Sequence, residues 1–338
     1  MRLSSPGWSP RGTANLETGL MVLRPTLSLL SPAGARARLS IMIFHRVLPQ
    51  RDPLFPAEVD ADDFDRICGW VASMFNVLPL DEAVDRRDRS SLPARALSIT
   101  FDDGYADNHD VAMPILQRHG LSAAFFVATG FLDGGRMWND SVIEAIRRTQ
   151  RQSLDLSHLG VDGLAEFDIG STEQRRAAIT AIIGKVKHRN PAERLQLVQA
   201  VAEACAASLP TDLMMRSDQV RAMRQGGMLV GAHTVSHPIL AGLSASDTRR
   251  EIADSRDCLQ AILGEPVSLF AYPNGKPVDD YSDETVGIVR DLGFKAAVST
   301  AWGAARADTD RHQLPRFTPW DQGRTRFGLR MMHNLWTT

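Results

Sequence analysis

The chain has 338 residues, of which 43% are hydrophobic, and its formal net charge is -2. This composition supports a large buried core and excludes disorder for most of the chain, and the near-neutral charge gives no electrostatic reason for a nucleic-acid partner. Although the chain is longer than a typical domain of about 150 residues, single α/β barrels commonly reach this size.

The first 37 residues are rich in Ser, Pro, Gly and Arg and are predicted to form a loosely ordered leader. The apolar stretch 19–30 is interrupted by Arg24 and Pro25, so neither a membrane-spanning helix nor a signal sequence is expected. Peripheral membrane contact is the alternative for this segment, and a cytoplasmic location is favoured. The three cysteines lack ligand spacing and are expected to be buried thiols rather than a disulfide framework: Cys68, Cys205 and Cys258.

From residue 38 onward, apolar strand patterns alternate with helical periodicity. Strands are predicted at 39–45, 76–79, 96–102, 122–128, 228–233, 267–272, 294–299 and 312–317. Helices are predicted at 61–74, 106–118, 246–263 and 282–292. Glycines that follow two of them, Gly120 and Gly293, indicate helix ends. The alternation predicts a parallel α/β sheet that closes into an irregular barrel spanning residues 38–338.

One stretch, from about residue 132 to 223, breaks this alternation. It is rich in Ala, Gln, Arg and Glu, has a helical pattern with no good strand, and is too long for an ordinary connection between a strand and a helix. Because it leaves one strand end and returns before the next strand, we expect a helical insertion that overhangs the mouth of the barrel. Such an insertion would shape access to a site there.

Two adjacent carboxylates, Asp102 and Asp103, end the strand pattern that begins at Ala96. A strand that ends in a polar turn presents its last side chains at the carboxyl edge of the sheet, where barrels keep their chemistry. Neighbouring residues there point in different directions, so one aspartate can hold a metal while the other moves protons. The alternative is an Asx-type turn that merely ends the strand.

Two histidines, His233 and His237, follow a second apolar strand pattern. Pro238 disfavours helical geometry at His237, so a turn at a strand end is expected instead of a helix. Two imidazoles and one carboxylate suit Zn²⁺ with a position open for water, although Fe(II) and other first-row metals accept the same ligands. The alternative is that this spacing binds nothing.

These segments resemble the motifs of a known family. Residues 100–105 are similar to the first motif of the polysaccharide deacetylases (carbohydrate esterase family 4), and residues 233–237 are similar to the second. The resemblance runs from about residue 39 onward and is greatest to the branch that deacetylates bacterial exopolysaccharides. That branch also carries an early strand ending in His, here 41–47, and a Phe-Ala-Tyr-Pro stretch, here 270–273.

The resemblance implies a distorted (β/α) barrel of about seven parallel strands. It also implies metal-dependent removal of acetyl groups from the N-acetylhexosamine units of an exopolysaccharide or its precursor, with release of acetate. The expected partner is therefore an N-acetylated glycan. The residues expected to bind the divalent metal, Zn²⁺ before others, are Asp103, His233 and His237. The first carboxylate of the pair, Asp102, is expected to be the base that takes a proton from the attacking water.

The acid that protonates the departing amine is expected to be His45, which matches the histidine on the family branch's first strand. A histidine titrates near neutral pH and can donate a proton to the leaving nitrogen. The alternative for His45 is a hydrogen bond at the strand terminus. Two other histidines, His312 and His333, are weaker candidates for the acid.

Three further residues receive roles from their positions at strand ends or at the start of the insertion. The backbone N–H of Tyr272 is a candidate to stabilise the oxyanion, with its ring as a wall of the acetyl pocket, or else it packs beside Pro273. Arg316 is expected to pair with Asp102 and hold it ionised. Trp138 either stacks on a sugar ring or anchors the insertion to the barrel.

Three other function classes are alternatives to a polysaccharide deacetylase. A non-catalytic glycan-binding relative would lack a ligand or the base, whereas this chain has all four positions. A glycosidase needs two carboxylates facing each other across a sugar, which adjacent residues cannot easily provide. The main alternative is a C–N hydrolase of the same fold that acts on a small ureide or cyclic amide in a closed pocket. The sequence does not define the oligomeric state.

Overall fold

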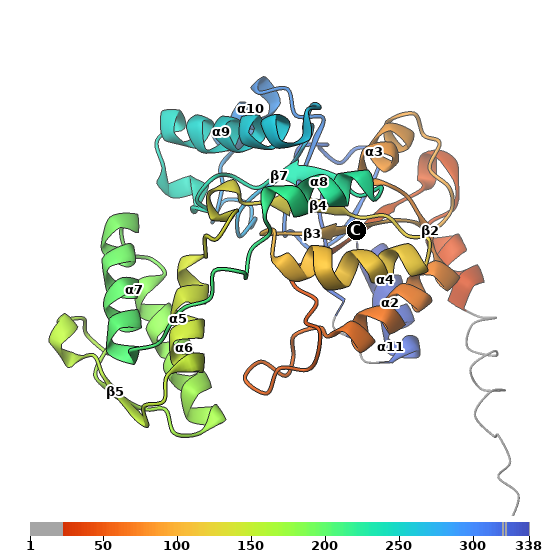
Figure 1. Ribbon diagram of the computed structural model, residues 1–338. Coiled ribbons are helices and arrows are strands. Elements are labelled where there is room, and N and C mark those ends of the chain that lie inside the picture. Colours follow the sequence, from red (N-terminus) through yellow and green to blue (C-terminus); the bar gives the residue numbers. More distant parts are fainter. Residues whose placement is uncertain (1–22, 320, 322, 338) are drawn as a thin grey trace, which may run out of the picture.

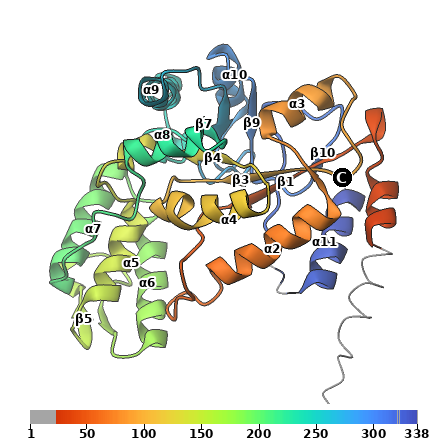
Figure 2. The ribbon, with the colours of Figure 1, turned by 45° about the vertical axis from the view of Figure 1, so that its right-hand side comes forward.

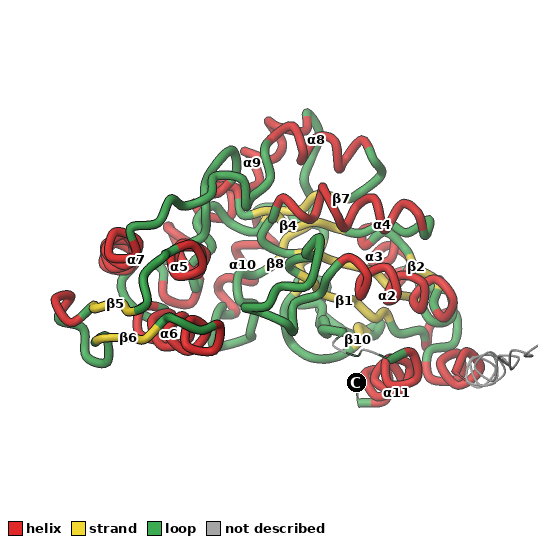
Figure 3. The backbone as a smooth tube through the Cα atoms, turned by 60° about the horizontal axis from the view of Figure 1, so that its bottom comes forward, coloured by secondary structure: helices red, strands yellow, loops and turns green. Residues whose placement is uncertain are grey.

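A computed structural model describes residues 23–319, 321 and 323–337 of the chain. Its centre is a curled, mostly parallel sheet that the helices surround (Figures 1 and 3). Six parallel strands follow one another in the sheet in the order β1 (Leu39–Phe44), β3 (Ala96–Phe101), β4 (Ala124–Val127), β7 (Leu229–Ala232), β8 (Leu269–Ala271) and β9 (Ala296–Val298). Two short strands flank them: β2 (Asn76–Val77), parallel to β3, and β10 (Ala304–Ala305), antiparallel to the start of β1.

The segment 314–317 lies between the two ends of this sheet and closes it. Ser299, directly after β9, donates its backbone N–H to the carbonyl oxygen of Leu314 at 2.9 Å. On the other side, Ile43 of β1 donates to the carbonyl oxygen of Phe317 at 3.0 Å. The predicted strand at 312–317 is thus a pair of isolated parallel bridges instead of a regular ladder. The distorted barrel predicted from the sequence is confirmed.

Helices pack around the barrel. They are α2 (Ala61–Met74), α3 (Leu80–Asp88), α4 (Met113–Arg118), α8 (Ser217–Gln225), α9 (Ala245–Leu263), α10 (Asp283–Asp291) and α11 (Arg324–Trp336). Among them, α3, α8 and α11 were not predicted as barrel helices from the sequence. The helix predicted at 106–118 differs, because residues 108–112 form a π-helix before α4. Pro114 has no N–H to donate to the carbonyl four residues earlier, and such irregularities often lie near functional sites. No helix of the described residues combines the length and apolar character needed to cross a bilayer.

Stacked aromatic rings pack between the sheet and α2. The ring of Phe101 lies between those of Phe44 and Phe125, with centroid distances of 5.2 and 4.7 Å, and Phe64 of α2 meets Phe44 and Phe101 edge-on. All three stacked side chains are buried. Because side chains alternate across a strand, Thr100 and Asp102 point to the opposite face of the sheet, where Arg316 contacts both.

The helical insertion packs beside the barrel as a separate group of elements (Figures 1 and 2, yellow and green). It contains α5 (Trp138–Arg148), β5 (Ser153–Asp155), β6 (Glu166–Asp168), α6 (Thr172–Val186) and α7 (Pro191–Cys205), which enclose their own apolar core. Two expectations were wrong here. The insertion does contain strands, a hairpin of three-residue strands too short to give a pattern. The helix at 217–225 packs on α9 and β7, so it belongs to the barrel.

The described part of the N-terminal segment is helical and not a loose leader. Residues 23–30 form a helix in which Leu23 and Leu27 are buried. A Cβ on Gly328 of α11 would lie 2.9 Å from the Leu23 side chain, so the two helices approach closely there. Residues 1–22 of the predicted leader lie outside the described residues. One cysteine also departs from expectation, since Cys258 on the outer face of α9 is exposed.

Candidate active site

The two aspartates that follow β3 occupy a turn with left-handed backbone geometry. Asp103 has φ of 76° and Gly104 has φ of 89°, and a Cβ at Gly104 would lie 2.9 Å from Val127. Glycine is therefore required at that position. The turn sends the two carboxylates in different directions, and both are buried, with exposed fractions of 2% for Asp102 and 7% for Asp103.

Asp102 forms a bidentate ion pair with Arg316, which the closing segment 314–317 delivers. Nη1 and Nη2 of Arg316 lie 2.8 and 2.7 Å from the two carboxylate oxygens, and Nε donates to the carbonyl of Ser299 at 2.8 Å. Burial by itself raises the pKa of Asp102, but the charges of Arg316 and His233 outweigh it, so the pKa is lowered from its ordinary value. Asp102 thus stays ionised although it is buried.

His233 and His237 lie on a tight turn that follows β7. Thr234 and His237 have φ of 64° and 53°, and the hydroxyl oxygen of Thr234 accepts the backbone N–H of His237 at 3.1 Å. The carboxylate of Glu251, from α9, accepts the backbone N–H groups of Val235 and Ser236, each at 2.9 Å. The segment forms a turn at the strand end, as predicted, and the buried backbone polar groups of the turn are satisfied by neighbouring side chains.

The structure brings Asp103, His233 and His237 together. Oδ1 of Asp103 lies 3.5 Å from Nε2 of His233 and 3.4 Å from Nε2 of His237, and the three atoms lie within 4.8 Å of one another. Nδ1 of His233 lies 2.8 Å from the carbonyl oxygen of Ala271, an arrangement that leaves Nε2 free to face the cluster.

The donor set of this cluster fits a divalent cation. Oδ1 of Asp103 is buried and has no hydrogen-bond donor among the described residues, which is costly unless a cation supplies the missing charge. Burial lowers the pKa of His237 to about 4, so its ring is neutral at pH 7 and has a lone pair to offer. One carboxylate and two imidazoles are a common ligand set for Zn²⁺.

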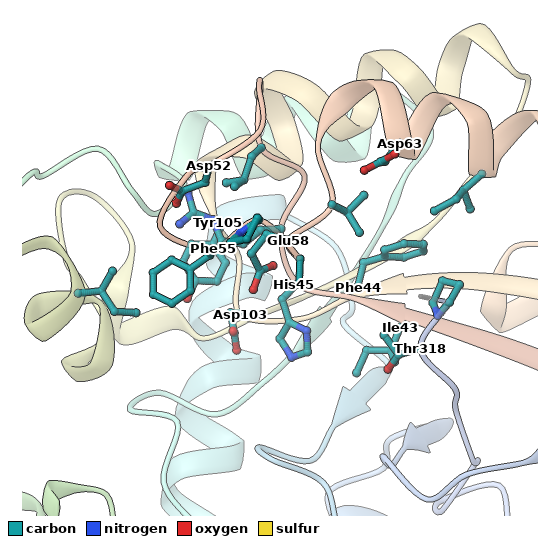
Figure 4. Close-up of a pocket in the computed structure, with 18 of the residues that line it drawn as sticks. Ile43, Phe44, His45, Asp52, Phe55, Glu58, Asp63, Asp103, Tyr105 and Thr318 are labelled. Atoms are coloured by element: carbon teal, nitrogen blue, oxygen red, sulfur yellow. The ribbon is translucent and has the colours of Figure 1, made fainter. Parts of the chain in front are cut away.

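His45 lies at the end of β1, beside this cluster. In Figure 4 its ring and the carboxylate of Asp103 point to the same side of the cavity. The side-chain amide of Asn108 donates to the backbone carbonyl of His45 at 2.8 Å and holds that strand end in place. Neither of the other two candidates for the acid lines the cavity, since His312 is buried against Phe294 and His333 is exposed on α11.

The role expected of Tyr272 is wrong. Its backbone N–H already donates to the carbonyl of Val298 at 3.2 Å as part of the sheet, so it is not free to stabilise an oxyanion. Its ring is fully buried, stacks on Tyr281 at 3.8 Å, and donates its hydroxyl to the carbonyl of His312. The residue holds the barrel together below the site and does not line the cavity.

Trp138 does not face the cavity either. Its ring is partly buried against the core of the insertion and is covered by the guanidinium of Arg194, 5.0 Å from the ring centre. Besides Phe44 and Tyr105, the aromatic side chains that line the cavity are Phe55, from the loop 46–60, and Trp70 of α2. Neither Phe55 nor Trp70 had a motif signal, and Phe55 reaches the site only because its loop docks on the insertion.

The cavity next to Asp103 has a volume of about 640 Å³ (Figure 4). It is bounded by the loop 46–60, by α2, by α5 and by Thr318, Pro319 and Asp321. The loop is tied to the insertion, since Arg147 forms a bidentate ion pair with Asp52 at 3.0 and 2.7 Å. Arg46, Tyr105 and Asp140, which received no individual role from the sequence, also line the cavity.

A family model described as polysaccharide deacetylase matches residues 89–156 and 167–297, more than half of the chain. The chain belongs to the polysaccharide deacetylase family. The resemblance seen in the two motifs is therefore confirmed. Both motifs lie inside the matched ranges, and the part of the insertion left out of the match, 157–166, is mostly the connection between the two strands of the short hairpin.

Proteins named as deacetylases are similar to this chain over most of their length. The protein YxkH of Bacillus subtilis (strain 168), named for this family, is 21% identical over 282 residues, which are 83% of this chain and 71% of YxkH. The Streptococcus pyogenes deacetylase PplD, solved with acetate, aligns with a TM-score of 0.59 and 22% identity over 88% of this chain and 98% of PplD. A de-N-acetylase of Aggregatibacter actinomycetemcomitans aligns with a TM-score of 0.55 and 16% identity, over 85% and 97%. These likenesses show a shared fold.

Proposed function

We propose that this protein is a metal-dependent N-deacetylase that removes acetyl groups from the N-acetylhexosamine units of a bacterial exopolysaccharide or its precursor. The single observation that carries the proposal is the cluster of Asp103, His233 and His237 beside the Asp102–Arg316 ion pair, at the edge of a cavity. Family membership supports deacetylation, and the name of the Aggregatibacter relative supports an N-acetyl substrate.

The three residues that would hold the metal are Asp103, His233 and His237. When bound there, a divalent ion such as Zn²⁺ would polarise the acetyl carbonyl and lower the pKa of water. The protein prepares the site with buried ligands that have few other partners, and it holds them through turns with left-handed backbone geometry at Asp103 and His237. Zn²⁺ is our assignment among the first-row metals that accept mixed oxygen and nitrogen donors.

Amide hydrolysis also needs a base for the attacking water and an acid for the leaving amine. Asp102 is the base in our proposal, because it is ionised and its carboxylate is oriented by both nitrogen atoms of the Arg316 fork. His45 is the acid, because it is the histidine at the cavity that is not part of the metal cluster. Their positions at the ends of adjacent strands, β3 and β1, let them act on one acetamide from two sides.

The alternative substrate, a small ureide or cyclic amide, fits the cavity less well. Its volume of about 640 Å³ lies in the range of pockets that enclose ligands much larger than a ureide. Phe55 and Trp70 give its lining aromatic faces, which suit the apolar faces of pyranose rings. Both features favour a sugar chain.

The test is acetate release from N-acetylglucosamine oligomers, measured with the purified protein and paired with elemental analysis of bound metal. We expect release that a chelator stops and that added Zn²⁺ restores. The matched control is Asp103→Asn, which should lose both metal and activity. Acetate release that continues after complete metal removal would contradict the metal-dependent mechanism, and a metal-loaded protein that releases no acetate would contradict the substrate.

A further inference from the structure

The cavity wall contributed by the insertion carries a carboxylate oxygen without a partner. Asp140 lies in the first turn of α5, lines the cavity and is only 5% exposed. Its Oδ1 accepts the hydroxyl of Tyr105 at 3.3 Å, whereas its Oδ2 has no hydrogen bond among the described residues. A buried acceptor without a hydrogen bond lowers the stability of the fold. A ligand that donates a hydrogen bond to this oxygen would remove that cost.

A cation, the guanidinium of Arg46, lies over the face of the same tyrosine ring. The guanidinium of Arg46 is 4.6 Å from the centre of the Tyr105 ring, and it also lines the cavity. Asp107 fixes its orientation, with both Nε and Nη2 of Arg46 at 2.8 Å from one carboxylate oxygen. About a quarter of the Arg46 side chain stays exposed. The wall therefore offers an acceptor, Asp140, and donors, Arg46, around one aromatic ring.

This combination selects the chemistry of the ligand. A hydroxyl group both donates and accepts hydrogen bonds, so it suits a wall with an acceptor and donors side by side. An ammonium group would be repelled by Arg46, and a carboxylate or phosphate would be repelled by Asp140. The wall also adjoins the proposed metal cluster, because Tyr105 follows Asp103 by two residues. A neutral sugar ring with free hydroxyl groups fits both conditions.

We propose that Asp140 and Arg46 form a subsite for the sugar ring, in which Oδ2 of Asp140 accepts a hydrogen bond from a sugar hydroxyl. The inference rests on the proposed function and extends it, because it makes the helical insertion part of the substrate site. The barrel supplies Arg46 and Tyr105, and the insertion supplies Asp140, so a sugar bound here contacts both regions.

The test compares the kinetics of wild-type protein, Asp140→Asn and Asp140→Ala on N-acetylglucosamine oligomers. We expect kcat/KM to fall by about 10- to 100-fold, mostly through KM, because a hydrogen bond to a charged group is lost. Metal content should stay unchanged. The matched control is Glu144→Gln, since Glu144 is equally buried one turn further along α5 and does not line the cavity. It should stay within about threefold of wild type.

Each other outcome overturns the subsite. Unchanged oligomer kinetics in Asp140→Asn would show that the carboxylate contacts no sugar. An equal loss in Glu144→Gln, or loss of metal in the Asp140 variants, would show a structural role instead. Wild-type protein that binds metal but releases no acetate from the oligomers would overturn the proposed function first and this subsite with it, so the two failures are distinguishable.

Discussion

The barrel rim buries charged side chains, whereas the helical insertion keeps most of its charged side chains on the surface. At the rim, Asp102, His233 and Arg316 are each at most 2% exposed, and their neighbours leave polar atoms without partners. In the insertion, the buried positions are mainly apolar, as in Ile146 and Val201, and most charges lie outside. Burying charged groups lowers the stability of the folded state, and the rim does so at the residues that we assign to catalysis. The insertion is instead stabilised by the burial of apolar side chains.

The backbone differs in degree. Left-handed φ angles at non-glycine residues gather at the rim, in Asp103, Thr234, His237 and Asn274, whereas in the insertion Ala206 has one at the end of α7. Such conformations cost free energy and persist where the surrounding structure enforces them, typically at functional sites. We infer a division of roles. Changes at the rim should alter the rate of the chemical step, and changes in the insertion or the docked loop should alter substrate affinity or stability.

The largest effect is expected for Asp102→Asn. The variant should lose acetate release by at least about 10³-fold, because the base is gone, while the metal stays bound by Asp103 and the two histidines. Activity assays and metal analysis of the same preparation measure this. Metal loss in Asp102→Asn would overturn the division of roles between the two aspartates.

His45→Ala should lower kcat by about 10²- to 10⁴-fold, because the leaving amine would lack its proton donor. His333→Ala is the matched control, since His333 is exposed on α11 away from the cavity, and it should leave kcat unchanged. Steady-state kinetics on the oligomers decide between them. A His45→Ala variant with near-wild-type kcat would require another acid at the rim.

A pair of aromatic variants tests the comparison between cavity and core. Phe55→Ala should raise KM by about 5- to 20-fold through lost contact with the sugar, together with a loss of stability, because its ring also packs on the insertion core. Trp138→Ala should instead lower the free energy of unfolding by about 2 to 4 kcal/mol, because the ring packs on the core of the insertion, and leave KM unchanged. Denaturant titration and kinetics on both variants measure the two effects. The reverse result would place the sugar against Trp138.

The last expected effect concerns the pH dependence of stability. Burial raises the pKa of Asp140 to about 7 from 3.8, against the charge of Arg46 and the hydrogen bond from Tyr105. The folded state therefore holds a proton that the unfolded state loses near pH 4, and stability falls as the pH rises from about 4 to 7. Asp140→Asn should be stabilised relative to wild type by about 2 to 4 kcal/mol at pH 8.

The matched measurement for that variant is made at pH 4, where the difference between Asp140→Asn and wild type should nearly vanish. Denaturant titrations at both pH values, with metal removed, give the comparison. A variant that is more stable at pH 8 but binds sugar less well would be the expected trade of stability for function at an active-site residue. Equal stability of Asp140→Asn and wild type at pH 8 would show that ionisation of Asp140 does not destabilise the folded state.

Local sequence patterns determined much of this protein. Helix α2 begins and ends where its periodicity predicts, and the carboxylates and imidazoles follow the strands that their apolar runs indicate. The turn at His237 was predictable from Pro238. These features depend on residues within a few positions of one another, so propensity and spacing are sufficient to define them.

Only the tertiary structure decided how distant segments meet. The segment 314–317 closes the barrel and delivers Arg316 to Asp102, over 200 residues away in the chain. The fate of Tyr272, whose polar groups are taken by Val298 and His312, depends on strand pairing, which no local pattern reveals. The cavity wall of Phe55 and Asp140 forms because a loop docks on an insertion. Packing between remote elements sets these contacts, and short-range sequence patterns carry no record of it.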